Sequence, residues 1–342
     1  MAPIKLLADR FSALGKMYEQ YFKGAQKPPA IAPTTAAALS VLFTLIYVVP
    51  FYLSPQTRPS PQLTRDAPSS IRARVQAVTC SCVASFALTV FVLHHYGNAS
   101  PQEVLKLLGF WPISFLDTAK TMLLVAILFA GPLFEAGVVD GDMKEWLRWQ
   151  PVREVLASWI GYRNYVVGPV SEELIWRSLI IPLHILARFS GKQIIFLTPL
   201  YFGIAHAHHL YEFRLTHPRT PLALAVLRSV FQFTYTSLFG FFAAFVFLRT
   251  GNILSIILAH SFCNFMGLPR FWGRVGVEAG VPIGPPGADK RADESARRVQ
   301  SKGIAWTVAY YVLLVAGAVG FYLQLFPLTE SIYALPVALR EQ

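Results

Sequence analysis

Residues 170–182 read VSEELIWRSLIIP, and this segment places two glutamates and an arginine in a strongly apolar part of the chain. Charged side chains in such surroundings cost free energy and are usually retained for function. In a helix, Glu172 and Glu173 point about 100° apart and cannot serve the same neighbour. Glu173 and Arg177 are four residues apart and can pair on one helix face. The segment therefore predicts a buried helix with a paired Glu173 and an unpaired Glu172.

Glu172 has no partner within its own segment, so we expect it to face a cavity. In a desolvated site it could accept or give protons near neutrality, whereas Glu173 should stay ionised beside Arg177. The alternative is a charged turn at the membrane surface, because structural ion pairs also occur in such segments.

The composition is that of a polytopic membrane protein. Of the 342 residues, 54% are hydrophobic and 14% are charged, whereas soluble domains carry about 25% charged residues. The net charge of +11 comes from loops and tails. The basic residues form no extended run interleaved with aromatic residues, so we expect no nucleic-acid partner. Membrane lipid, with its anionic cytosolic leaflet, is the expected partner of these loops.

The hydropathy pattern predicts an all-α, polytopic integral membrane protein with about eight transmembrane helices around an intramembrane polar cavity. About 20 apolar residues are needed to cross a bilayer, a length that the shorter segments barely reach. We expect an amphipathic N-terminal segment at 1–30, a single transmembrane domain at 31–330 and a C-terminal tail at 331–342. The expected spans are 36–53, 75–93, 119–134, 165–189, 194–210, 222–248, 253–268 and 305–326.

Polar residues of three separate spans fall at a similar depth. Counting membrane sides along the chain puts Glu172, His206, His260 and Asn264 toward the same face. Three helices that place polar groups in one layer predict a polar cavity within the membrane. The loops on that face carry more Lys and Arg than those on the other, so we expect the cavity to open to the cytosol.

These residue types fit a hydrolytic reaction. A carboxylate at Glu172 would deprotonate a water molecule, while His206 helps to hold that water and passes a proton on. His260 and Asn264 are four residues apart on one helix face and offer N–H donors for an oxyanion. Cys263 could instead be the nucleophile of a cysteine–histidine pair, although buried free cysteines commonly serve as apolar filler.

The histidine-rich sequence at 206–209 raises the possibility of a metal site. His206 and His209 are three residues apart and could bind zinc together with Glu172 or His260. The chain lacks the HExxH pattern that supplies two ligands and a base from one helix. Without a metal, one of these histidines would be catalytic, with His209 a secondary candidate, or all of them would be structural.

The polar residues also resemble a known family. Three motifs resemble those of the CAAX-protease and bacteriocin-processing superfamily, most closely its eukaryotic Ras-converting CAAX prenyl endopeptidases. The similarity extends from about residue 65, where Arg65-Asp66-Ala67-Pro68 stands, to residue 272. The motifs are Glu172-Glu173-x-x-x-Arg177, Phe202-x-x-x-His206 and His260-x-x-x-Asn264.

The resemblance implies a multi-pass protease of the endoplasmic reticulum membrane. Its substrates would be isoprenylated CAAX proteins, such as Ras-type small GTPases, from which it removes the last three residues. By resemblance, Glu172 and His206 activate water, His260 and Asn264 form the oxyanion hole, and supporting positions fall at Glu173 and Arg177. The family uses no metal and no cofactor, so the resemblance implies none here.

Two other classes of function predict different patterns. A transporter that uses buried Glu and His as a proton relay would spread polar groups across the membrane depth and show internal symmetry, and the sequence shows neither. A non-catalytic scaffold would be expected to have lost one of Glu172, His206, His260 or Asn264. All four are present, which favours an enzyme.

Overall fold

The computed structural model describes residues 28–60, 63–276 and 303–337. The predicted amphipathic segment at 1–30 thus lies almost wholly outside the described residues. Within those ranges the regular structure is entirely helical. The elements are α2 (Pro33–Val48), α3 (Pro50–Leu53), α4 (Pro68–His95), α5 (Pro101–Leu107), α6 (Phe115–Leu128), α7 (Ala130–Phe134), η1 (Glu135–Val139), α8 (Met143–Trp146), α9 (Trp149–Ala157), α10 (Trp159–Tyr162), η2 (Arg163–Val167), α11 (Gly168–Glu173), η3 (Leu174–Leu179), α12 (Ile180–Leu186), α13 (Gly191–Ala205), α14 (His208–Thr216), α15 (Leu222–Thr250), α16 (Ile253–Met266), α17 (Ile304–Gln324) and η4 (Pro327–Thr329).

The predicted class, a helical multi-pass membrane protein, is confirmed, but the number of eight spans is not. Four stretches of the described chain are long and apolar enough to cross a membrane: Pro33–Leu53, Pro68–His95, Leu222–Thr250 and Ile304–Gln324. A further pair, Phe115–Leu128 and Ala130–Val139, is bent by 79°.

The remaining three predicted spans differ from simple membrane helices for physical reasons. With 15 and 14 residues, α13 and α16 are shorter than the roughly 20 residues that a bilayer requires. The segment predicted at 165–189 belongs to a continuous helical stretch that carries three charged residues close together. For these three segments, the predicted crossing of the membrane remains a prediction.

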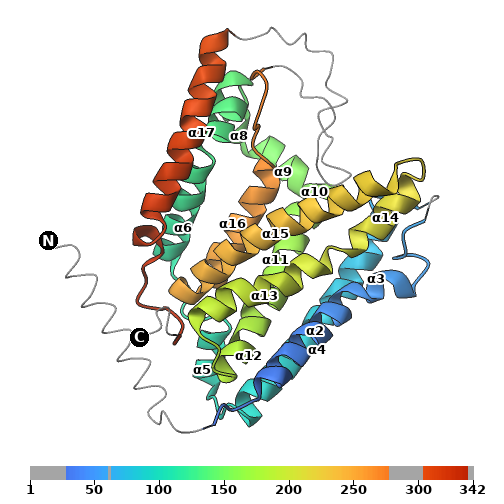
Figure 1. Cartoon of the computed structure of the whole chain (residues 1–342), viewed down its shortest axis with the longest axis vertical. Coiled ribbons are helices and arrows are strands. Elements are labelled where there is room, and N and C mark those ends of the chain that lie inside the picture. Colours follow the sequence, from blue (N-terminus) through green and yellow to red (C-terminus); the bar gives the residue numbers. More distant parts are fainter. Residues whose placement is uncertain (1–27, 61–62, 277–302, 338–342) are drawn as a thin grey trace, which may run out of the picture.

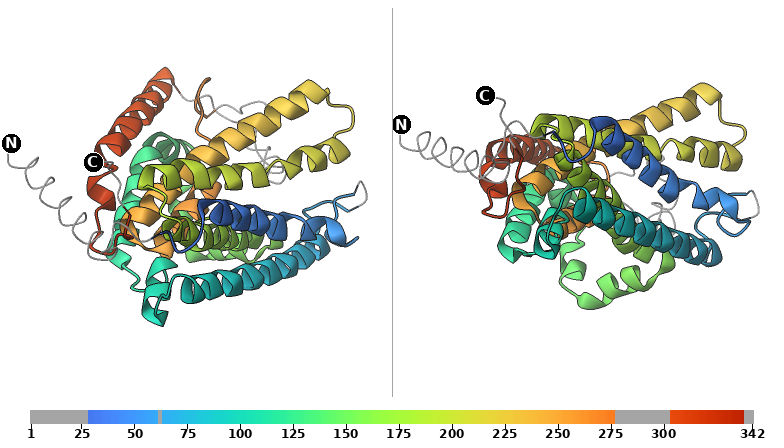
Figure 2. Two further views of the ribbon diagram at one scale, coloured as in Figure 1. Left: turned by 60° about the horizontal axis from the view of Figure 1, so that its bottom comes forward. Right: turned by 90° about the horizontal axis from the view of Figure 1, so that it is seen from below.

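The helices form two groups with the charged stretch between them (Figure 1). On one side α2 packs against α4, and α13 packs against α15. On the other side α16 packs against α6, and α17 packs against α6 and α7. The stretch from η2 to α12 contacts members of both groups, including α4, α2 and α16. Figure 2 shows the same arrangement from two further directions. The charged residues are thereby placed at the centre of the protein.

Two glycines permit the close packing of α13 against α15. A Cβ atom at Gly203 would lie 2.4 Å from Ser237 Oγ, and one at Gly240 would lie 2.6 Å from Pro199 Cβ. Any larger residue would push the two helices apart. Because Gly203 stands one helical turn before His206, this contact also fixes the position of that histidine.

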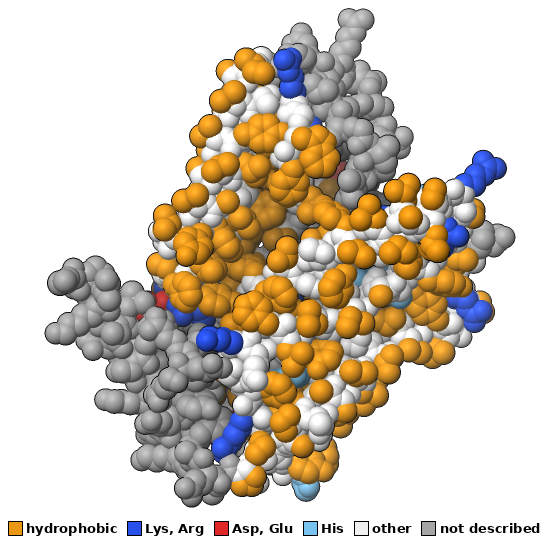
Figure 3. All heavy atoms as spheres, in the orientation of Figure 1, with side chains coloured by type: hydrophobic (Ala, Val, Ile, Leu, Met, Phe, Trp, Pro, Cys, Tyr) orange, Lys and Arg blue, Asp and Glu red, His pale blue; other side chains and the backbone are white. Residues whose placement is uncertain are grey.

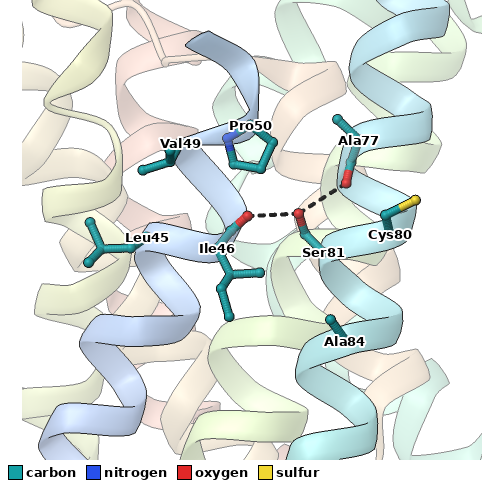
Figure 4. Close-up of a pocket in the computed structure, with 8 residues that line it drawn as sticks. All are labelled: Leu45, Ile46, Val49, Pro50, Ala77, Cys80, Ser81 and Ala84. Carbon is teal, nitrogen blue, oxygen red and sulfur yellow. Dashed lines mark hydrogen bonds between the residues drawn. The ribbon is translucent and has the colours of Figure 1, made fainter. Parts of the chain in front are cut away.

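The outer surface is predominantly apolar, as expected for a protein that faces lipid (Figure 3). Leu53, Val83, Leu238 and Val315 are each more than half exposed. An open apolar groove of about 480 Å³ runs between α2 and α4 (Figure 4). Its polar Ser81 Oγ donates to the carbonyl of Ile46 at 2.7 Å, so the groove presents little free polarity.

Part of the predicted C-terminal tail packs against the membrane domain. The Leu335 amide donates to the Leu248 carbonyl at the end of α15 at 2.8 Å, and the Leu335 side chain is buried. Gly251 ends α15 in the left-handed conformation, with φ of 55°, that glycine adopts without strain. The described residues 331–337 therefore contact the domain whose predicted boundary is residue 330.

Candidate active site

Glu172 and Glu173 both lie on α11, between two π-helical segments. η2 precedes α11 and η3 follows it directly, so the helix is wound more loosely on both sides. Such π-helical turns frequently occur at functional sites. Pro182 lies within α12 and does not break the helix there.

Glu173, Arg177 and His260 form a buried chain of polar contacts. Arg177 Nη1 donates to Glu173 Oε1 at 3.0 Å, which confirms the predicted pairing. The Nδ1–H of His260 donates to the same oxygen at 2.7 Å, since a carboxylate can only accept. Glu173 and Arg177 are 0% and 1% exposed. The Arg177 guanidinium also lies over the rings of Phe202 and Phe239, 4.7 and 5.6 Å from their centroids.

Glu172 differs from its neighbour in both exposure and contacts. Its side chain is 21% exposed, and its Oε2 lies 3.7 Å from His260 Nε2. This separation is longer than a hydrogen bond, but one water molecule can hydrogen-bond both atoms at about 2.8 Å. We call Glu172, Glu173, Arg177 and His260 the inner cluster. In it, Glu173 orients the imidazole by its Nδ1 and leaves Nε2 facing Glu172.

A tyrosine of α2 supports α11 from the other side. The hydroxyls of Tyr47 and Ser171 are hydrogen-bonded at 2.9 Å, and the Tyr47 ring packs edge-on against Trp176. Tyr47 is also within electrostatic range of Glu172. No sequence pattern indicates this contact, because the two hydrogen-bonded residues are 124 positions apart.

His206 lies next to Phe202, whose ring also contacts His260 of the inner cluster. It caps α13, and its Nδ1–H donates to the Phe202 carbonyl at 2.8 Å. This bond fixes the tautomer in which Nε2 accepts. The Phe202 ring contacts both histidines, with centroids 4.7 Å from His206 and 6.3 Å from His260. The ring of Phe202, in the second motif, thus contacts both predicted imidazoles, and the Phe202 carbonyl holds that of His206.

Asn264 lies on α16, one turn after His260, and is exposed. Its Nδ2 donates to the Asn164 carbonyl at 3.0 Å, and the nearby Ser261 hydroxyl donates to the Tyr165 carbonyl at 2.6 Å. These two bonds join α16 to η2, a link that sequence reasoning missed. The convergence of the Asn264 amide with His260 on one oxyanion remains a prediction.

Cys263 is a half-buried free thiol on the same helix. It lies within electrostatic range of Glu173. A negative neighbour disfavours the thiolate, which is the nucleophilic form. These surroundings favour the interpretation of Cys263 as filler.

A second group of charged residues lies where α14 meets the turn before α4. Glu212 accepts from Arg74 Nη2 and from His209 Nδ1, each at 2.8 Å. Arg163 Nη1 donates to Asp66 Oδ1 at 2.7 Å and to the Arg65 carbonyl at 3.1 Å. We call this group the outer cluster; its charged members are Arg65, Asp66, Arg74, Arg163 and Glu212.

The metal-capable group in the described chain differs from the one that the sequence suggested. His208, His209 and Glu212 bring one ligand atom each within 4.8 Å of one another, whereas the predicted set combined His206 and His209 with Glu172 or His260. Burial alone would raise the pKa of the Glu212 carboxyl, but the His209 hydrogen bond and the Arg74 charge hold it well below its ordinary value. A carboxylate that already neutralises a guanidinium is a poor ligand for an additional cation, so these residues fit a metal badly.

Comparison with known proteins identifies the family. A profile for type II CAAX prenyl endopeptidase Rce1-like proteins matches residues 154–266. Probable CAAX prenyl protease 2 of Schizosaccharomyces pombe is 37% identical over 238 residues, which cover 70% of this chain and 83% of that protein. CAAX prenyl protease 2 of Homo sapiens is 35% identical over 222 residues, covering 61% and 64% of the two chains.

The similarity continues toward both ends in a plant relative. CAAX prenyl protease 2 of Arabidopsis thaliana is 29% identical over 324 residues, covering 89% of this chain and 92% of that protein. No solved structure matches significantly. The matched region contains the inner cluster and all three predicted motifs, and the chain belongs to the Rce1-like family of CAAX prenyl proteases.

Proposed function

We propose that this protein is an intramembrane endopeptidase that removes the C-terminal tripeptide from isoprenylated CAAX proteins, such as Ras-type small GTPases. The relatives are named CAAX prenyl proteases. The observation that carries the mechanism is the position of Glu172, 3.7 Å from an imidazole whose other nitrogen is held by Glu173.

In the first step Glu172 removes a proton from a water molecule near His206. The water oxygen attacks the carbonyl carbon of the prenylated cysteine, and the carbonyl π electrons move onto its oxygen. Glu172 suits this role because it is partly accessible and has no arginine partner of its own. Its neighbour Glu173 is committed to Arg177 and His260.

In the second step the tetrahedral intermediate collapses. N–H donors of His260 and of the Asn264 amide stabilise the oxyanion. The C–N bond breaks, and the proton held by Glu172 passes to the leaving amine with the help of His206. The products are a prenylated cysteine carboxylate and a free tripeptide.

The substrate must reach this site from the cytosolic side. The outer cluster contains three arginines on the segments that adjoin η2 and α14, as expected for a cytosolic face. We propose a multi-pass protein of the endoplasmic reticulum membrane, as the family resemblance implies, with its active site open to the cytosol, which these arginines support.

The decisive experiment is an assay for tripeptide release. The purified protein should release the last three residues of a farnesylated CAAX peptide and should leave its unprenylated twin intact. Release by the wild type that persists in Glu172→Gln would overturn the mechanism. Chelation followed by zinc addition separates a zinc-dependent protease, which would lose and regain activity, from the metal-free reaction proposed.

A further inference from the structure

The outer cluster has more positive than negative groups. It contains three guanidinium groups, from Arg65, Arg74 and Arg163, and two carboxylates, from Asp66 and Glu212. All five side chains are at most 25% exposed. A cluster so shielded from water favours an additional anion that restores neutrality.

Two neighbouring arginines of the outer cluster, Arg65 and Arg163, have N–H donors without a close partner. Arg65 is 3.9 Å from Asp66 and 3.8 Å from Glu212, so its ion pairs are longer than hydrogen bonds. Arg163 uses Nη1 and Nε, but its Nη2 is buried without a hydrogen-bond partner among the described residues. Both guanidiniums approach the same Asp66 oxygen. Two guanidinium groups with unused N–H donors therefore lie beside one another, and paired N–H donors are what carboxylate recognition requires.

Arg74 and Arg177 are unsuitable for the same role. Arg74 is committed to Glu212 at 2.8 Å and to the Thr57 carbonyl at 2.9 Å. Arg177 is 1% exposed and packed between two phenylalanine rings beside Glu173. Arg74 is thus held by two short contacts. Arg177 also has a buried Nη2 without a partner among the described residues, but it is shielded from solvent within the inner cluster.

The distance to Glu172 fits a short peptide. Arg163 precedes Glu172 by nine residues in one continuous helical stretch, which corresponds to roughly 13 Å along the axis. The terminal carboxylate of a released tripeptide lies about 10 Å from the bond that is cut when the peptide is extended. Tyr235 lies within electrostatic range of both Arg65 and Glu172, so the two clusters are neighbours in space.

We propose that Arg65 and Arg163 bind the free C-terminal carboxylate of the substrate. This proposal rests on the proposed function and adds a specificity site to it. The site fixes the terminal carboxylate, and the distance from there to Glu172 selects the bond three residues away. The enzyme thereby selects the scissile bond by its distance from the C-terminal carboxylate of the substrate.

The test compares two farnesylated CAAX peptides that differ only at the C-terminus, one with a free carboxylate and one with an amide. The wild type should favour the carboxylate peptide by about 10–100-fold in kcat/KM, as expected for a charge-assisted contact. Arg163→Gln and Arg65→Gln should lower kcat/KM for the carboxylate peptide and leave the amide peptide unchanged. Because each ratio is measured within one preparation, partial misfolding of a variant does not affect it.

Arg72→Gln is the matched control. Arg72 is exposed on α4, with its guanidinium 5.5 Å from the Trp159 ring centroid, and belongs to neither cluster. This variant should keep the wild-type preference. Arg163→Lys should recover part of the preference, because it retains the charge but not the two-pronged geometry.

Three results would overturn the proposed carboxylate site. The first is a wild type that cleaves both peptides equally well, which would leave the proposed function intact. Cleavage of neither peptide would instead reject the proposed function itself. An equal loss on both peptides in Arg163→Gln and Arg65→Gln would indicate a structural role. If the preference persists in both variants while they lose an activation by phosphatidylserine vesicles seen in the wild type, the cluster binds a lipid headgroup instead.

Discussion

The inner and outer clusters are both built from arginines, acidic residues and histidines, but their balance of charge differs. In the inner cluster Glu173 is fully buried and shared by Arg177 and His260, and Glu172 is left without an arginine. In the outer cluster the carboxylates are fully engaged and guanidinium groups remain. The inner cluster has the composition of a site for proton transfer, and the outer cluster that of a site for an anion.

The largest effect is expected at the residue that distinguishes the inner cluster. Glu172→Gln keeps the shape of the side chain but removes its basicity, so turnover of a farnesylated peptide should fall by about 10²–10⁴-fold. Thermal unfolding in detergent should be unchanged, since Glu172 has no buried ion pair with arginine. Glu145→Gln, at an exposed position on α8, serves as the control. Wild-type turnover in Glu172→Gln would contradict the role of Glu172 as the base, and with it the functional difference between the two clusters.

The next effect is on stability. Arg177→Met leaves the fully buried Glu173 with His260 but without its arginine, and breaking a buried pair costs about 3–5 kcal/mol. Arg74→Met should lower the unfolding temperature less, because Glu212 retains His209 and Arg65 as partners. Calorimetry or scanning fluorimetry of the two purified variants tests this order, and an equal shift would contradict the proposed difference in burial.

A smaller loss is expected at the predicted oxyanion donor. Asn264→Ala should lower kcat by about 10²–10³-fold with little change in KM, the usual cost of one such donor. Ser261→Ala is the matched variant, because Ser261 also joins α16 to η2 but has no proposed chemical role. Similar losses in both variants would show that Asn264 acts only through helix packing.

The smallest effect should come from Cys263. Cys263→Ser should change turnover by less than about twofold, because a half-buried thiol beside a carboxylate packs as apolar filler and takes no part in the proposed reaction. The peptide assay with the purified variant checks this. Complete inactivation would replace the water-based mechanism with a cysteine nucleophile.

The sequence predicted one contact of the inner cluster, because that contact follows local spacing. The pairing of Glu173 with Arg177 depends on the four-residue repeat of a helix, and that pairing is present. The contact of Glu173 with His260 joins residues 87 positions apart. Nothing in the spacing indicates that Glu173, rather than Glu172, would hold that imidazole at hydrogen-bond distance.

The outer cluster and the number of spans could not be predicted in the same way. Arg74 and Glu212 are 138 positions apart and meet only because of how α4 and α14 pack. Hydropathy counts each apolar segment as a span, but α13 and α16 have 15 and 14 residues, fewer than the roughly 20 that a bilayer requires. Both helices begin at side-chain caps, Ser190 and Asn252, whose effect a hydropathy average does not register.

The π-helical segments η2 and η3, on either side of α11, affect how this part of the chain tolerates the deletion of a residue. A π-helical turn contains more residues than an α-helical turn of the same rise, so η2 and η3 each accommodate extra chain. Deleting one residue from η3 would let the segment rewind as a regular helix of similar length. Side chains beyond η3 would then keep their orientation, because η3 had absorbed the extra residue, whereas Arg177 within η3 would turn by about 100° relative to Glu173. In an alignment of relatives, a single-residue gap at 174–179 would thus mark a changed register of the carboxylates against Arg177, whereas the same gap in a surface loop would be neutral.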